Sequence, residues 1–321
     1  MSFTETIKNY ILNDCKMDLV GIAPASALDD APTGHRATDV LPGAKSLIVF
    51  ARRITDGAIS AAFRKIEDGN LDAQSAYATY GSDLLPNMNL FFMQFNIAEY
   101  VERTYGYTTL PVPSGPMHNV TSVNVKLPIF MGPNKTYMIL DVDKAAVAAG
   151  LGEYAWSNCV VTPEFGPRQQ FGMVVTQMEL DYDKPYSGEK LCDHEKCGLC
   201  ARICPTHALS ETECCAKTVC GKEYPVGKMN TNSCAVAALA FRKEFAGKAK
   251  NNVPDQIMHD APTDEELAKA YAEKPVQHSG LDHYPKYFCN KCMLYCPLGK
   301  WKERFFDRNL SKFDGNEELI K

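Results

Sequence analysis

The sequence predicts an α+β protein in two parts, in which a mixed first domain precedes a cysteine-rich second one. The first observation is length, because 321 residues exceed what one hydrophobic core usually encloses. The second is composition, since 45% hydrophobic and 23% charged residues are ordinary for a folded globular chain. The third is that all but two of the 13 cysteines follow residue 190. We therefore expect domains at residues 1–180 and 181–321.

Short strands and helices fill the first domain. Apolar runs bounded by Pro and Gly predict buried strands, and apolar residues three and four positions apart predict packing helices. An alanine-rich segment predicts a further helix that ends at Gly150. The expected strands are 18–23, 46–51, 159–161 and 171–180. The expected helices are 58–68, 87–104 and 143–149.

The second domain begins with a connector at 181–189, which contains Pro185 and Gly188. Residues 244–280 are polar and hold three prolines and an acidic helical stretch at 264–273. We expect this segment to be an exposed insertion between groups of cysteines.

Charge and the N-terminus limit partners and location. The net charge is −5 and the basic residues form no single tract, which disfavours RNA or DNA as a partner. The first 15 residues have no apolar stretch of signal-peptide length, and no window reaches the roughly 20 apolar residues of a membrane span. We expect a cytoplasmic protein without membrane association. Clustered cysteines in that reducing compartment indicate metal ligands rather than disulfides.

Two cysteine motifs predict two four-iron four-sulfur clusters in a ferredoxin-like domain. The first motif is Cys192-x4-Cys197-x2-Cys200-x3-Cys204-Pro205, and the second is Cys289-x2-Cys292-x3-Cys296-Pro297. In bacterial two-cluster ferredoxins the cysteine before proline ligates the other cluster. The ligands assigned to the first cluster are Cys192, Cys197, Cys200 and Cys296. Those assigned to the second are Cys204, Cys234, Cys289 and Cys292.

Two of these ligand assignments have alternatives. Cys234 completes the second set because it stands alone at the start of an apolar helical run, whereas the other cysteines between the motifs crowd a polar loop. His194 is the alternative to Cys192, since ordinary ferredoxin spacing places a ligand at position 194. Zinc is the alternative metal, but four-cysteine zinc sites come as two pairs without the Cys-x3-Cys-Pro ending.

Two segments lie upstream of the motifs, Ala-Gly-Leu-Gly-Glu at 149–153 and Thr-Pro-Glu-Phe-Gly-Pro-Arg at 162–168, and the two Cys-Pro motifs follow them. In this combination the chain resembles the epoxyqueuosine reductase and reductive dehalogenase superfamily. The resemblance covers most of residues 15–300. Further counterparts occur in the same order at 18–23, 41–48 and 105–107.

The resemblance implies that the first domain has a nitroreductase-like fold and binds cobalamin. Glycines in the two segments would let the backbone approach a large planar cofactor. The simpler alternative is that Gly150 stops a helix and Gly166 makes a turn. The residues that the resemblance assigns to cofactor contact are Gly150, Leu151, Gly152, Thr162, Pro163 and Gly166.

The resemblance also implies a proton donor, which is a tyrosine near a basic residue in dehalogenases and an aspartate in epoxyqueuosine reductases. Tyr107 and Arg168 are the nearest catalytic candidates by their order in the chain. Each competes with a simpler explanation as a core or surface residue. The alternatives are Tyr105, Tyr154, Asp141, Asp143 and His118.

These features predict an oxidoreductase, a cobalamin-dependent iron-sulfur reductase that cleaves a carbon–heteroatom or carbon–halogen bond of a small organic substrate. A low-potential donor such as ferredoxin or flavodoxin would supply its electrons. We expect no tRNA role, because only 25 residues follow Cys296 and a helical-repeat region is not among them. The alternatives are an electron-transfer or corrinoid-reducing protein without its own substrate chemistry, and the same fold filled with flavin.

Overall fold

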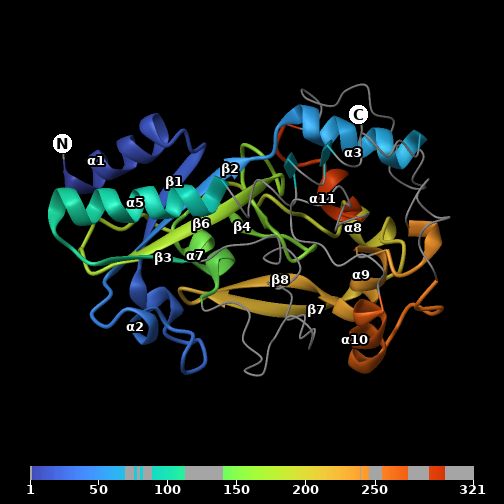
Figure 1. The fold of residues 1–321 in the computed structure, drawn as a ribbon. Coiled ribbons are helices and arrows are strands. Elements are labelled where there is room, and N and C mark those ends of the chain that lie inside the picture. Colours follow the sequence, from blue (N-terminus) through green and yellow to red (C-terminus); the bar gives the residue numbers. More distant parts are fainter. Residues whose placement is uncertain are drawn as a thin grey trace.

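The computed structural model has a mixed α and β architecture, which confirms the predicted fold class (Figure 1). A four-stranded antiparallel sheet lies at the centre of its N-terminal part, in the order β1-β2-β6-β3. The strands are β1 (Leu19–Pro24), β2 (Ser46–Arg53), β6 (Gln169–Thr176) and β3 (Thr109–Val112). The structure describes residues 2–68, 76–77, 80–81, 89–112, 140–238, 240–245, 255–273 and 289–300.

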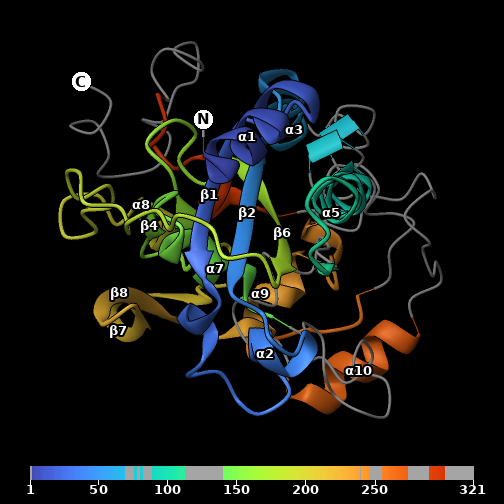
Figure 2. The ribbon, with the colours of Figure 1, turned by 90° about the vertical axis from the view of Figure 1, so that its left-hand side faces the viewer.

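Both faces of the sheet are buried because apolar residues follow one another along its strands. Ile48 and Phe50 of β2 pack with one layer of helices, and Leu47 and Val49 pack with the other. The two layers lie on opposite sides of the sheet in Figures 1 and 2. One layer contains α1 (Phe3–Asn9), η1 (Tyr10–Asp14) and α5 (Leu90–Tyr105). The other contains η2 (Ala25–Leu28), α2 (Ala37–Val40) and α7 (Val142–Ala148).

Most expected elements are confirmed, with differences at their ends. The strand expected at 171–180 ends at Thr176, because Ser46 Oγ rather than a strand partner accepts the Leu180 N–H at 3.1 Å. The helix expected at 87–104 is observed as α5, which begins at Leu90 and ends at Tyr105. Residues 87–88 lie outside the described residues. Gly106 ends α5 at φ 75°.

The C-terminal part contains short helices and one long hairpin. The cysteines expected in a polar loop, Cys214, Cys215 and Cys220, lie instead on strand β7 or at the hairpin turn, so that expectation was wrong. Cys214 and Cys215 pair with Gly227 and Val226 of β8, and such cross-strand partners are not visible in local sequence. The elements are α8 (Leu199–Arg202), β7 (Leu209–Val219), β8 (Lys222–Met229), α9 (Thr231–Ala238), α10 (Asp264–Ala272) and α11 (Lys291–Leu294).

Helix α3 (Asp56–Asp68) belongs to the N-terminal part of the chain and packs against short helices of the C-terminal part. Its Phe63 shares an apolar cluster with Leu199 of α8 and Leu294 of α11, two helices that lie within the first and second cysteine motifs. Helix α10, inside the segment expected to be exposed, buries Leu267 against Phe241. In the part of the chain that the structure describes, no helix has the length and apolar character needed to cross a membrane.

Candidate functional site

A two-stranded hairpin holds the start of the first cysteine motif. Its strands are β4 (Glu153–Tyr154) and β5 (Val160–Val161), which pair antiparallel. The buried Glu153 carboxylate accepts the backbone N–H groups of Leu191 at 2.7 Å and Cys192 at 3.2 Å. Because two N–H groups share one charged acceptor, this carboxylate fixes the path of the chain as it enters the motif.

Trp156, on the turn between β4 and β5, contacts both residues that compete as the first ligand. Its backbone N–H donates to the Cys192 sulfur at 3.4 Å. Its indole ring stacks on His194, with ring centroids 3.6 Å apart and planes 8° from parallel. The His194 ring therefore has a packing role, and the Cys192 sulfur accepts the kind of N–H···S bond that tunes iron-sulfur ligands.

The first group of cysteines combines both motifs. Burial raises the pKa of the Cys200 thiol well above its usual range, and the neighbouring thiols of Cys296, Cys192 and Cys197 raise it further. Burial raises the pKa of Cys296 to about 12, against the opposing charge of Arg168. The structure thus brings together the four cysteines that spacing assigned to the first cluster.

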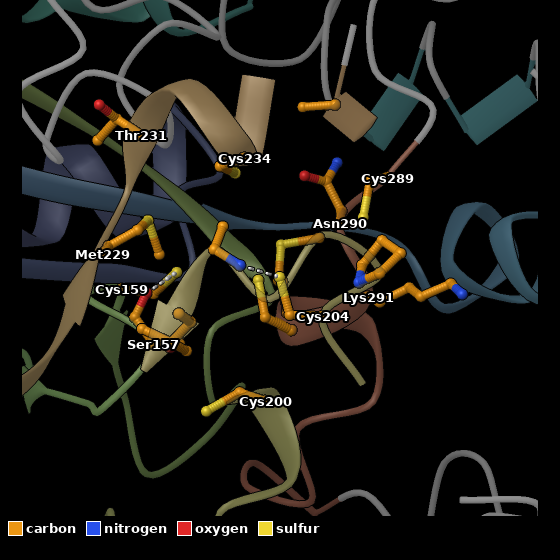
Figure 3. Close-up of a pocket in the computed structure, with 16 residues that line it drawn as sticks. Ser157, Cys159, Cys200, Cys204, Met229, Thr231, Cys234, Cys289, Asn290 and Lys291 are labelled. Carbon is orange, nitrogen blue, oxygen red and sulfur yellow. Dashed lines mark hydrogen bonds between the residues drawn. The ribbon is translucent and has the colours of Figure 1, made fainter. Parts of the chain in front are cut away.

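The second group surrounds one cavity (Figure 3). Burial raises the pKa of the Cys234 thiol, and nearby Cys289 and Cys204 raise it further. Cys204, which follows α8, accepts the Ala208 N–H at 3.2 Å. The cysteines lining the cavity are Cys159, Cys200, Cys204, Cys234, Cys289 and Cys292.

The donor set fits iron-sulfur chemistry in three respects. The sulfurs are the preferred ligands of iron-sulfur clusters, the cysteines that carry them are partly buried, and backbone N–H groups point at several of them. Burial without a metal disfavours the thiolate form, which the positive charge of iron would stabilise. Among the described residues, no three His, Cys, Asp or Glu side chains lie close enough to hold a metal ion. A four-iron cluster spreads its ligands over four irons, so its sulfurs lie farther apart than those around one ion.

Arg168 lies within the protein, against the second motif. Its side chain is 1% exposed, and one Nη donates to the Cys296 carbonyl at 2.8 Å and the Met293 carbonyl at 3.4 Å. The other Nη donates to the Leu298 carbonyl. A planar guanidinium suits this task because its donors form a rigid fork. The structure therefore places Arg168 as a clamp on the backbone that carries Cys296.

The predicted glycines pack against backbone of the same chain. A Cβ on Gly166, where φ is 58°, would lie 2.7 Å from the Leu298 carbonyl oxygen. A Cβ on Gly150 would collide with the Lys184 carbonyl, and one on Gly152 with the Val161 carbonyl. Close backbone packing and a left-handed turn thus account for these glycines without a cofactor.

The remaining residues assigned to cofactor contact have mixed positions. Thr162 is buried, and its hydroxyl accepts the Phe165 N–H at 3.2 Å inside the turn that Gly166 closes. Leu151 packs against the core beside the central sheet. Pro163 is exposed.

Tyr107 and Arg168 lie at opposite ends of β6. Thr109, two residues after Tyr107, pairs with Thr176, whereas Arg168 directly precedes the other end of the strand. Seven residue steps of strand span about 23 Å. Tyr107 is also 45% exposed. The structure does not bring the two predicted catalytic residues together.

The alternative catalytic residues have structural roles where they are described. Asp141 caps α7 by accepting the Lys144 N–H at 2.9 Å. Tyr154 is buried in the core, and Tyr105 packs edge-on against Phe3. Asp143 is buried on α7, and His118 lies outside the described residues.

Two residues beside the cysteines were missed at the level of sequence. Tyr77 is buried, and its hydroxyl oxygen accepts a hydrogen bond from Asn290 Nδ2 at 2.9 Å. Burial raises the pKa of Tyr77, and the nearby thiols of Cys292 and Cys289 raise it further. Cys159 lines the cavity of the second group. No local pattern marks Tyr77, whereas Cys159 was visible as a cysteine close to the segment 162–168.

Sequence comparisons identify relatives that are oxidoreductases. Over 68 residues, 21% of its length, the chain is 43% identical to a tetrachloroethene reductive dehalogenase from Sulfurospirillum multivorans. One from Desulfitobacterium hafniense is 40% identical over 67 residues, or 20% of this chain. The matches cover 13% and 12% of those proteins, so the chain spans about an eighth of their length. No family model matches the chain.

Solved structures that align with most of the chain have low sequence identity and TM-scores below 0.5. Epoxyqueuosine reductase from Streptococcus thermophilus aligns with a TM-score of 0.46 and 15% identity, over 82% of this chain and 68% of that one. An epoxyqueuosine reductase solved with a modified tRNA stem loop gives 0.45 and 16%, over 85% and 72%. A reductive dehalogenase linked to B12-dependent dehalogenation gives 0.45 and 18%, over 85% and 33%. Over the aligned 67–68 residues the chain is therefore similar in sequence to reductive dehalogenases, which belong to the superfamily that its motifs resemble.

Proposed function

We propose that this protein is a cobalamin-dependent iron-sulfur reductase that performs reductive cleavage on a small organic substrate. The observation that carries the proposal is the assembly of the two cysteine groups, four thiols each, in a chain whose sequence matches reductive dehalogenases. Residues 1–180 are proposed as a nitroreductase-like, cobalamin-binding domain, and residues 181–321 as a ferredoxin-like domain with two clusters. We propose a cytoplasmic location, because the free cysteines of the chain suit a reducing compartment.

The cysteine groups would pass electrons one at a time through the protein interior. The first group begins beside the Trp156 and His194 rings, and the second surrounds the cavity drawn in Figure 3. Cys200 lines that cavity while its thiol also neighbours Cys296 and Cys192, so the two groups adjoin. Bound cobalamin would supply a strongly reducing cobalt centre for bond cleavage. A low-potential ferredoxin or flavodoxin is the proposed donor.

Tyr77 is proposed as the proton donor in place of Tyr107, because Tyr77 is buried beside Cys289 and Cys292 whereas Tyr107 is exposed. Asn290 donates to the Tyr77 oxygen, which leaves the phenolic proton for another acceptor, and the raised pKa keeps that proton bound. Arg168 would act on the first cluster through the backbone of Cys296 rather than on substrate. For the cofactor contacts, the exposed Pro163 and the partly buried Leu151 remain proposals.

A small organic molecule is the proposed substrate, and a nucleic acid is the competing class. The expectation that nucleic acid is disfavoured conflicts with one similar structure, an epoxyqueuosine reductase solved with a tRNA stem loop. Net charge of −5 and dispersed basic residues support the small molecule. A gel-shift experiment with a tRNA stem loop separates the two classes, and binding at physiological salt would favour the nucleic acid.

Cobalamin reconstitution tests the proposal. Anaerobically purified protein is supplied with cobalamin and iron, desalted, and examined for bound cobalt and its visible spectrum. Reduced methyl viologen and 3-bromo-4-hydroxybenzoic acid, the compound bound in one similar dehalogenase structure, then serve as electron donor and substrate. Two electrons and one proton replace the carbon–bromine bond with a carbon–hydrogen bond and release bromide. We expect about one cobalt per chain and bromide release.

Each contrary result has a defined meaning. Absence of retained cobalt, or a flavin spectrum, would overturn the cobalamin assignment. Bound and reduced corrinoid without turnover of bromo- or chloro-substrates would favour the corrinoid-reducing protein. Tyr77→Phe should lower turnover about 100-fold with both clusters retained if Tyr77 donates the proton. Tyr107→Phe is its matched control, and we expect it to keep full turnover.

A further inference from the structure

Cys159 is held in a defined place by the turn between β4 and β5. The Ala155 N–H donates to the Cys159 carbonyl at 2.9 Å, and the Asn158 N–H donates to the Ala155 carbonyl at the same distance. The Asn158 side-chain amide donates to the Gly227 carbonyl of β8 at 2.8 Å. Asn158 itself is left-handed, with φ at 67°. Hydrogen bonds therefore close the turn on itself and also tie it to strand β8.

The Cys159 thiol faces the cavity of the second cysteine group. Figure 3 shows Cys159, Cys204, Cys234 and Cys289 around this cavity. Burial raises the pKa of Cys234 and of Cys292, and the thiol of Cys159 is among the neighbours that raise both further. Its own contact is long, 3.9 Å from sulfur to the Ser157 carbonyl oxygen. A weak contact of this kind costs little to break.

A buried cysteine is often only a small apolar side chain, and Cys15 illustrates that case. Cys15 lies in the apolar cluster with Ile11 and Ile22, on the helical layer of the sheet. Cys159 differs, because it lines a cavity together with five other cysteines. The cavity of the second group is therefore lined by a fifth thiol, Cys159, in addition to the four assigned to that cluster.

We propose that Cys159 is a reserve ligand of the second cluster, able to take the fourth position when Cys234 does not occupy it. The proposal rests on the proposed clusters. An iron that lacks the Cys234 sulfur has an open position, and Cys159 lines the same cavity. The Cys159 thiol releases one proton to water and its sulfur binds the iron, and no electron is gained or lost. Thiolate is the usual ligand of such clusters, so the exchange preserves the cluster type.

Iron and sulfide content, with the electron paramagnetic resonance of the reduced protein, test the proposal in anaerobically reconstituted full-length chains. The variants are Cys234→Ala, Cys159→Ala and the double variant, and Cys214→Ala on the exposed face of β7 is the matched control. We expect about eight iron per chain in wild type, the control and both single variants. Cys234→Ala should have altered resonance positions for one cluster. The double variant should fall to about four iron.

The outcomes separate failure of this proposal from failure of the clusters. About four iron in Cys234→Ala alone, or about eight in the double variant, would overturn the reserve role. About four in Cys159→Ala alone would make Cys159 the resident ligand and overturn it as well. Four or fewer in wild type would overturn the proposed clusters themselves. If circular dichroism finds the double variant unfolded, Cys159→Ser with Cys234→Ala preserves side-chain volume and decides the same question.

Discussion

The two cysteine groups are assembled in different ways. Three cysteines of the first group lie within residues 192–200, and only Cys296 comes from elsewhere. The second group draws on the end of α8, on α9, and on the segment around α11, with Cys159 from the β4–β5 turn added. A single loop can therefore define most of the first site, whereas the second exists only when distant parts of the chain fold together.

The residues that hold the two cysteine motifs in place also differ. Glu153 and Trp156 bind the entry to the first motif directly, through backbone N–H and sulfur. The second motif is held through its carbonyl groups by Arg168, and by the turn at Gly166. The segment 162–168, which resembles a family motif, thus packs on residues 293–299, at the end of the second motif and just after it. Damage to it should affect Cys296 and hence the first cluster.

Removal of Cys296 gives the largest expected effect and tests whether the groups are interlocked. Cys296→Ala should lose the first cluster although the residue belongs to the second motif, because its thiol lies beside Cys200, Cys192 and Cys197. Iron should fall from about eight to about four per chain. Resonance signals of the second cluster should remain. Loss of the second cluster instead would contradict the proposed crossing of ligands.

Arg168→Ala should come next, since it leaves the carbonyls of Met293, Cys296 and Leu298 without a buried charged donor. Hydrogen bonds to charged groups contribute about 1.5–3 kcal/mol, so we expect a loss of about 3 kcal/mol in unfolding free energy. The iron of the first cluster should be chelated faster than that of the second. Arg168→Lys keeps the charge but not the planar set of donors. Its unfolding free energy and its rate of iron chelation should therefore lie between those of wild type and of Arg168→Ala. Unchanged stability and chelation would exclude the clamp.

Gly166→Ala sharpens the comparison through backbone packing. The new Cβ meets a left-handed φ of 58° and the Leu298 carbonyl oxygen at 2.7 Å. We expect a cost of about 2–3 kcal/mol, measured by denaturant unfolding. Gly106→Ala is the matched control, because φ there is 75° and nothing lies within 4 Å of the added Cβ. It should lose only the part due to φ, about 1 kcal/mol. Equal losses of unfolding free energy in Gly166→Ala and Gly106→Ala would show that the contact with Leu298 contributes nothing.

Glu153→Gln should have the smallest effect. The amide retains an oxygen for the Leu191 and Cys192 N–H groups but loses the charge that strengthens both bonds. A loss of about 1 kcal/mol follows, with both clusters present. Thermal unfolding of the reconstituted protein measures it. Glu153→Ala, which leaves both N–H groups without this acceptor, should lose more, and a smaller loss than in Glu153→Gln would contradict the assignment.

Much of the fold and of the cysteine grouping followed from local sequence. Apolar runs located β1 and β2, three- and four-residue spacing located α3, and an alanine-rich segment located α7. Motif spacing grouped the thiols that the structure brings together. The hairpin β7–β8 was missed because its exposed strand residues are polar and its register depends on a partner strand. Tyr77, Cys159 and the carbonyl contacts of Arg168 depend on tertiary packing, which no spacing rule encodes.

The central claim is that eight cysteines in two groups hold two clusters. Iron and acid-labile sulfide, counted in anaerobically reconstituted wild-type protein, test it most directly. We expect about eight of each per chain, with two interacting paramagnetic centres after reduction. About four of each with a single centre, or zinc bound in place of iron, would contradict the account.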